Sequence, residues 1–317
     1  MLSVLQKTAI EQEIFLCSIL GNFYALFSVI RLLSAGRPMS RSVYVLFPLL
    51  TIVGALCGPA FGQRAYSNVP TGIFGEKDQR VRISSDRWPW VAIGRINVIA
   101  GTWPQLCTGT VIGSRRVLTA AQCLFDARIN NWVKPSSVHF VLGQEKDKNL
   151  GHSVVESFVK SPDFAYRLEE RPRWDAIDPK MIRRNWAILS LRDELPVKPI
   201  PLRTITSSEL SAGSPGEFAL AGYAADREYV LSVHRGCAIS MDDSEPGVLT
   251  HMCDTVGESG APILLFKDDG ASVIGIHSSI VYDFEPQVGY KPRFGQGVSV
   301  GEIEPAARQG STETPFR

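Results

Sequence analysis

The sequence has almost no net charge. Its 33 lysines and arginines balance 32 aspartates and glutamates within 317 residues, which leaves a formal charge of +1 at pH 7. This balance gives no electrostatic basis for binding nucleic acid or an anionic membrane surface. Long blocks of like charge, internal repeats and low-complexity tracts are also missing, so neither a charged tail nor a repeat array is expected. No Cys-x-x-Cys pair occurs, which argues against a zinc site, and no other metal or cofactor is indicated.

The six cysteines fall into two groups. Cys17 and Cys57 lie in an apolar leader, and the other four lie in the body of the chain. An even number of cysteines predicts disulfides if the protein is exported. Four cysteines allow three pairings, and the two short loops of equal separation favour Cys107–Cys123 together with Cys237–Cys253.

The N-terminal region contains two apolar runs, Ile14–Leu33 and Val43–Ala60. The segment that begins at Met39 has a basic residue, Arg41, then an apolar stretch, and then a cleavage-site pattern with small residues, Ala60-Phe61-Gly62. This is the layout of a secretory signal peptide, which we place at 39–62. A short N-terminal or pro-segment, 63–73, would follow the cleavage point.

Residues 1–38 are then an over-long start or an extra apolar leader. The alternative is that Ile14–Leu33 is a retained membrane span, since about 20 apolar residues suffice to cross a bilayer. The cleaved form would be secreted or periplasmic, and the uncleaved form would be anchored in a membrane. Both interpretations place the rest of the chain outside the cytoplasm.

From Trp88 onward, about a dozen short runs rich in valine, isoleucine and aromatic residues alternate with turn residues. Examples are CTGTVIGS (107–114) and APILLF (261–266). Long helical periods are missing, so an all-β sandwich or barrel is expected. The charged stretch Asp163–Asn185 predicts a long surface loop, and Glu302–Gln309 predicts a short helix.

Three motifs follow in order along the chain: VLTAAQC (117–123), NWAILSL (185–191) and CDTVGESGAPIL (253–264). Their order, with Cys107–Cys123 at a matching spacing, resembles the chymotrypsin/trypsin family of serine endopeptidases over about residues 74–301. In that family a histidine stands in Ala-Ala-His-Cys, an aspartate begins Asp-x-Ala-Leu-x-Leu, and the serine nucleophile stands in Gly-Asp-Ser-Gly-Gly-Pro.

The resemblance implies a fold and the positions of a site. The fold is all-β, with two six-stranded antiparallel Greek-key barrels over 74–303, a site in the cleft between them and a C-terminal tail over 304–317. Ser259 stands at the nucleophile position, but Gln122 replaces the histidine base and Asn185 replaces the aspartate. An amide does not titrate near neutral pH, so Gln122 cannot take up the serine proton and return it. The two amides are expected to hydrogen-bond each other instead.

The neighbours of Ser259 match the family in part. Gly257 and Ser259 retain the two backbone N–H groups of an oxyanion hole. Glu258 replaces the family's aspartate and is one methylene longer, which puts in doubt the buried contact with a freed N-terminus. Ala261 replaces a glycine, which is a small change.

Finer features resemble the bacterial branch that includes glutamyl endopeptidases. FGEKDQRVRI (74–83) followed by WPWVAIGRI (88–96) is similar to the start of their mature domain. His277 in VIGIHS matches their pocket histidine, and Thr255 matches a threonine of their nucleophile loop. The resemblance implies that both side chains bind a substrate carboxylate, more strongly when His277 is protonated. The alternative is that His277 only caps a polar strand end.

These observations predict an exported trypsin-like serine protease homologue that is inactive or severely impaired and binds a peptide or protein in its cleft. One alternative is an active serine endopeptidase with an atypical base and a preference for acidic residues. Another is a regulatory protein that no longer uses the cleft. A substitute base among the other histidines is not expected, and neither is a metal, a cofactor or nucleic acid. A membrane is a partner only if the N-terminal apolar segment is retained.

Overall fold

A computed structural model describes residues 72–99, 105–126, 129–164, 179–211, 217–268, 270–287 and 289–308. These residues belong to one compact unit, Asn68–Arg317. The predicted leader and signal peptide, nearly all of the segment 63–73, most of the predicted charged loop and residues 309–317 of the tail lie outside the described residues. Within the described ranges, no helix has the length and apolar character needed to cross a bilayer.

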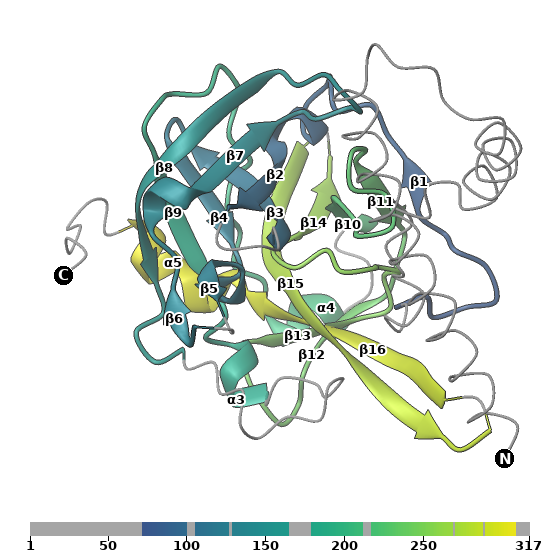
Figure 1. The fold of residues 1–317 in the computed structure, drawn as a ribbon. Coiled ribbons are helices and arrows are strands. Elements are labelled where there is room, and N and C mark those ends of the chain that lie inside the picture. Colours follow the sequence, from purple (N-terminus) through teal and green to yellow (C-terminus); the bar gives the residue numbers. More distant parts are fainter. Residues whose placement is uncertain are drawn as a thin grey trace, which may run out of the picture. The chain divides into compact units, whose positions relative to one another are not determined.

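The first barrel is closed and antiparallel (Figure 1). Its strands follow the hydrogen-bonded order β2 (Ile93–Val98), β3 (Gln105–Gly113), β4 (Arg116–Thr119), β9 (Ala187–Leu191), β8 (Gly151–Lys160) and β7 (Val138–Leu142). Along the barrel strands, side chains that point into the barrel alternate with side chains that point outward. On β7, Val138, Phe140 and Leu142 are at most 1% exposed, whereas the intervening His139 is half-buried. Apolar side chains at every second position therefore fill the interior.

The second sheet is antiparallel and has eight strands. Its order is β1 (Val81–Arg82), β11 (Ser232–Arg235), β10 (Glu217–Gly222), β14 (Pro262–Lys267), β15 (Gly270–Glu285), β16 (Gly289–Ser299), β13 (Val248–His251) and β12 (Ile239–Met241). The predicted all-β architecture is confirmed, and the second half has eight strands in one sheet where a six-stranded barrel was expected. The difference comes from two short edge strands, because β1 pairs with β11 and β12 pairs with β13.

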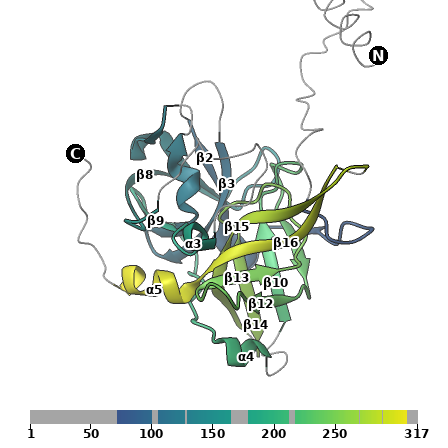
Figure 2. The ribbon, with the colours of Figure 1, turned by 90° about the horizontal axis from the view of Figure 1, so that it is seen from below.

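Strands β15 and β16 extend beyond the rest of their sheet as a two-stranded ribbon (Figure 2). The pairing of β14 with β15 ends where Pro262 faces Ile276, whereas β16 stays paired with β15 as far as Glu285. From Ser279 to Val281, one edge of β15 therefore has no strand partner among the described residues.

Short elements connect the strands. They are η1 (Trp90–Ala92), η2 (Ala121–Leu124), β5 (Phe125–Asp126), β6 (Asn131–Trp132), η3 (Pro135–Ser137), α3 (Pro179–Ile182), α4 (Ser207–Ser211) and α5 (Val300–Arg308). The helix predicted at Glu302–Gln309 corresponds to α5, which begins two residues earlier. Val300 and Ile303 of α5 are 0% exposed, so this helix is held by apolar packing.

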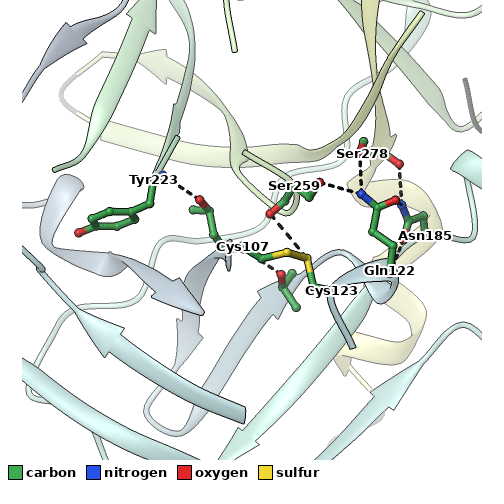
Figure 3. The surroundings of a disulfide bond; sticks show 9 residues. Cys107, Gln122, Cys123, Asn185, Tyr223, Ser259 and Ser278 are labelled. Atoms are coloured by element: carbon green, nitrogen blue, oxygen red, sulfur yellow. Dashed lines mark hydrogen bonds between the residues drawn. A yellow bond between two sulfur atoms is a disulfide. The ribbon is translucent and has the colours of Figure 1, made fainter. Parts of the chain in front are cut away.

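Both predicted disulfides are present. Cys107 of β3 is bonded to Cys123 of η2 with an S–S distance of 2.04 Å, and Cys237 is bonded to Cys253 with a distance of 2.02 Å. The first bond ties η2 to the barrel strand β3 (Figure 3). The second bond holds Cys253, which directly precedes the loop that carries Ser259.

Candidate active site

The three predicted catalytic positions come together from separate elements (Figure 3). Gln122 lies on η2 and Asn185 lies shortly before β9. Ser259 lies on the loop 254–261 between β13 and β14, which we call the nucleophile loop. Gln122 and Ser259 are half-buried, whereas Asn185 is 0% exposed.

Gln122 and Asn185 hydrogen-bond each other in a fixed direction. The backbone N–H of Gln122 donates to Asn185 Oδ1 at 2.9 Å, and Asn185 Nδ2 donates to Gln122 Oε1 at 2.9 Å. A backbone N–H can only donate, so it determines which atom of the Asn185 amide is the oxygen. The predicted pairing of two neutral amides is therefore present, and it has a defined orientation.

The Gln122 amide, held in this orientation, also hydrogen-bonds Ser259. Its Nε2 donates to Ser259 Oγ at 2.7 Å and to the backbone carbonyl of Ser278 at 3.0 Å. A carbonyl oxygen can only accept, so Ser278 fixes Nε2, and not Oε1, on the side of Ser259. The serine oxygen thus receives a hydrogen bond at the position where a serine nucleophile gives its hydrogen to a base.

This arrangement removes what acyl transfer requires. A hydrogen bond donated to Oγ draws electron density away from the oxygen of Ser259. Neither amide has a titratable group near neutral pH, so the serine proton has no base and a leaving group has no acid. Of the described side chains that hydrogen-bond Ser259 Oγ, none carries a group that titrates near neutral pH.

Ser278 is a site residue that the sequence analysis did not identify. It lies on β15 and is 1% exposed. Its hydroxyl oxygen accepts a hydrogen bond from Asn185 Nδ2 at 2.6 Å, in addition to the contact of its carbonyl with Gln122. The signal in the sequence is a serine shortly after the apolar run VIGI of this strand, because a hydroxyl that is buried needs a polar partner.

The two predicted oxyanion donors lie on the nucleophile loop. The N–H groups of Gly257 and Ser259 donate to no acceptor within the described part of the chain. Gly257 has a φ of +67°, and a Cβ there would lie 3.0 Å from the Ala225 Cβ, so the loop requires glycine. Both N–H groups are therefore open to a ligand oxygen.

Thr255 and Glu258 are buried and contact each other. Thr255 is 0% exposed, and its hydroxyl donates to Glu258 Oε2 at 3.1 Å. The prediction that Thr255 binds a ligand carboxylate is corrected, because this hydroxyl is already engaged by a buried carboxylate. Glu258 is 1% exposed, and its Oε1 lies 3.4 Å from Arg80 Nη1. In the family, the acidic residue at this position contacts a freed N-terminus. In this chain, the side chain of Arg80 contacts it instead.

His277 belongs to a buried histidine pair. Its Nδ1 lies 2.9 Å from His251 Nε2, and His251 Nδ1 accepts a hydrogen bond from the Cys253 backbone N–H at 3.2 Å. Neutral His251 must then donate through Nε2, which leaves His277 Nε2–H as a donor for a ligand. Burial lowers the pKa of His277 to about 4 and holds the pKa of His251 well below its ordinary value. The positive charge expected to strengthen ligand binding is therefore absent at neutral pH.

The comparisons with known proteins identify the family and the fold. The family model described as Trypsin matches residues 79–299. The chain belongs to the trypsin family. A solved Glu endopeptidase has a TM-score of 0.54 at 16% identity, over 75% of this chain and 100% of that one. The VesB protease of Vibrio cholerae has a TM-score of 0.52 at 17% identity, over 74% of this chain and 67% of that one. At these identities both structures support the fold alone.

A curated relative of this trypsin-family chain is described as inactive. Inactive serine protease PAMR1 of Xenopus tropicalis is 23% identical over 145 residues. The match spans 41% of this chain and only 18% of that longer protein.

No other histidine of this trypsin-family chain replaces the missing base. His139 and His152 hydrogen-bond each other at 2.8 Å, and His234 Nδ1 accepts from the Asp254 backbone N–H at 2.8 Å. None of these rings hydrogen-bonds Ser259 in the described structure. Across the same residues, no cluster of three or more histidine, cysteine or acidic side chains offers a metal site.

Strand β3 fixes the spacing between the two halves of the site (Figure 3). Cys107 is bonded to Cys123, the residue next to Gln122. The following residue of β3, Thr108, donates its backbone N–H to the Ser259 carbonyl at 2.9 Å. Two consecutive residues of one strand therefore hold both partners of the hydrogen bond between Gln122 and Ser259.

Proposed function

We propose that this trypsin-family protein is exported, does not hydrolyse peptides, and binds a peptide or protein ligand around Ser259. The observation that carries the proposal is the hydrogen bond from Gln122 Nε2 to Ser259 Oγ, which puts a donor where a protease needs a base. The two disulfides support export, because such bonds persist in oxidising compartments. The description of PAMR1 as an inactive serine protease is in keeping with the same conclusion.

Several binding groups support a peptide ligand at this site. The edge of β15 at Ser279–Val281, which pairs with no other strand among the described residues, offers backbone groups to an extended segment that would add a strand to the sheet. The N–H groups of Gly257 and Ser259 offer two donors to a ligand oxygen. His277 of β15, whose backbone hydrogen-bonds Gly260 and Ala261 of the nucleophile loop, adds Nε2–H as a further donor.

The decisive experiment measures turnover. The purified protein should hydrolyse peptide anilides and activated esters no faster than its Ser259→Ala variant, because no group takes the serine proton. A fluorophosphonate probe should likewise label Ser259 far more slowly than it labels an active serine protease. Turnover by the unmodified protein that disappears in Ser259→Ala would establish the alternative, an active endopeptidase with an atypical base.

The ligand side chain is tested with matched peptides. A peptide containing glutamate should bind about tenfold more tightly than its glutamine counterpart, because a hydrogen bond to a charged acceptor is stronger than one to a neutral acceptor. Since the pKa of His277 is about 4, this preference should stay constant from pH 6 to pH 8 and not increase as the pH falls through that range.

Calorimetric titration of both peptides into wild type and His277→Ala measures the preference. His139→Ala, a change on the first barrel, is the control and should behave like wild type. Equal affinities for the two peptides in every protein would leave His277 as a structural residue only.

A further inference from the structure

Two of the five histidines of the chain meet on the outer surface of the first barrel. His139 lies on β7 and His152 lies on β8, which are neighbouring strands of that barrel (Figure 1). The register pairs His152 with Val141, two positions after His139, so both histidines lie on the same face of the sheet. This face is the outer one, because Phe140 on the opposite face is 0% exposed whereas His152 is exposed.

The two rings approach each other through nitrogen atoms. His139 Nδ1 lies 2.8 Å from His152 Nε2, so one of these nitrogens donates a hydrogen bond and the other accepts it through its lone pair. The second nitrogen of each ring hydrogen-bonds no group in the described part of the chain. Because a neutral imidazole keeps one hydrogen on either nitrogen, both rings can carry it on the nitrogen that faces away. Two lone pairs would then point into the space between the rings.

A third polar side chain lies beside this pair. Asn97 of β2 is directly opposite His139 in the antiparallel register, so its side chain is on the same outer face, with the two Cβ atoms about 4.5–5.5 Å apart. Asn97 Oδ1 is buried and accepts no hydrogen bond from any residue that the structure describes. A buried acceptor without a donor is unfavourable, and a bound cation would relieve this cost.

These atoms suit a divalent metal ion. Neutral imidazole nitrogens together with an oxygen are ligands that Zn²⁺ accepts. Zn–N bonds are about 2.0–2.1 Å long, so a tetrahedral ion places its two nitrogens about 3.3 Å apart. The spacing between His139 and His152 is slightly shorter than this, and a small rotation of the exposed His152 ring would widen it. Partial burial and the neighbouring His152 lower the pKa of His139, so this ring is neutral and available to a metal at pH 7.5.

We propose that His139, His152 and Asn97 form a binding site for one zinc ion. His139 Nδ1 and His152 Nε2 supply two ligands, Asn97 Oδ1 supplies the third, and water completes the tetrahedron. The ion takes the place of the hydrogen between the two rings and connects the strands β2, β7 and β8. No local motif in the sequence indicates such a site, because the two histidines are 13 positions apart and meet only across neighbouring strands.

The binding test titrates ZnCl₂ into the full-length chain at pH 7.5 by calorimetry, after treatment with a chelator. Wild type should bind zinc, and His139→Gln and His152→Gln should each weaken this binding by at least about tenfold. Asn97→Ala should weaken it by about tenfold. Glu156→Gln, which removes an exposed acidic group from the same strand as His152, is the control and should bind like wild type. Zinc affinity that is the same in wild type and in both histidine variants overturns the proposal.

Two further measurements separate this site from zinc bound elsewhere on the chain. One equivalent of CuCl₂ serves as a spectroscopic probe, and pulsed electron paramagnetic resonance should detect two imidazole nitrogens in wild type and one in each histidine variant. ZnCl₂ at a hundredfold excess over its dissociation constant should raise the melting temperature of wild type by about 5–10 °C, and this rise should be lost in His139→Gln. A wild-type copper signal without two imidazole nitrogens contradicts the site. Neither measurement involves Ser259, so the result is independent of the proposed function.

Discussion

Replacing Gln122 by histidine and Asn185 by aspartate together restores serine-dependent hydrolysis, whereas either change alone leaves the protein nearly inert. Gln122 Nε2 already lies 2.7 Å from Ser259 Oγ, and Asn185 Oδ1 already accepts from the Gln122 backbone N–H. A histidine alone meets the Asn185 Nδ2 donor, which favours the tautomer that points Nε2–H at Ser259. An aspartate alone has no imidazole to orient. In the worked chymotrypsin triad, exchanging that aspartate for asparagine lowers turnover by about 10⁴-fold. We expect the double variant to exceed the better single variant by about 10³- to 10⁴-fold.

The measurement is kcat/KM for an activated ester and a peptide anilide with both single variants and the double variant. Adding Ser259→Ala to the double variant is the control, and it should remove the regained activity. Ser278 accommodates the aspartate, because its hydroxyl can rotate from accepting to donating a hydrogen bond. A double variant no more active than Gln122→His would contradict the conclusion that the two amides are what disables this site.

Removing either disulfide lowers the melting temperature by roughly 6–12 °C. Each bond closes a loop with a sequence separation of 16, and a loop of this length stabilises a protein by about 3 kcal/mol through the restricted unfolded chain. In a domain of this size, about 1 kcal/mol corresponds to about 2–4 °C. Cys107→Ser with Cys123→Ser and Cys237→Ser with Cys253→Ser can be compared with wild type by calorimetry.

Wild type heated with and without a reductant serves as the internal control for these variants. The reduced protein should melt below both double-serine variants, because it loses both bonds at once. A change smaller than about 2 °C in each variant would mean that the packing of the sheets, and not the cross-links, determines thermal stability.

The fold and the cysteine pairing were predictable because local patterns carry them. Short runs rich in valine, isoleucine and aromatic residues between turn residues identify strands such as β7, and the equal spacing within Cys107–Cys123 and Cys237–Cys253 favours one pairing of three. The contact between Gln122 and Asn185 was also predictable, because two amides that replace an ion pair at facing positions can satisfy each other without burying a charge.

The remaining contacts were not predictable, because they join side chains that only the folded chain brings together. Arg80 lies 178 positions from Glu258, and in FGEKDQRVRI it has the pattern of an ordinary surface charge. Asn185 lies 93 positions from Ser278, and the local sequence around each residue does not predict their contact. Thr255 illustrates the converse: its position was identified, but the carboxylate that engages its hydroxyl belongs to the protein itself.

Strand β3 is bonded both to the element that carries Gln122 and to the loop that carries Ser259. Gln122 belongs to the first barrel and Ser259 to the second sheet, yet neighbouring residues of β3 fasten both, Cys107 through its disulfide and Thr108 through its backbone. Because Cys107 and Thr108 are consecutive, a small displacement of one sheet against the other would move Gln122 and Ser259 as a pair. We therefore expect the hydrogen bond from Gln122 to Ser259 to persist when a ligand binds.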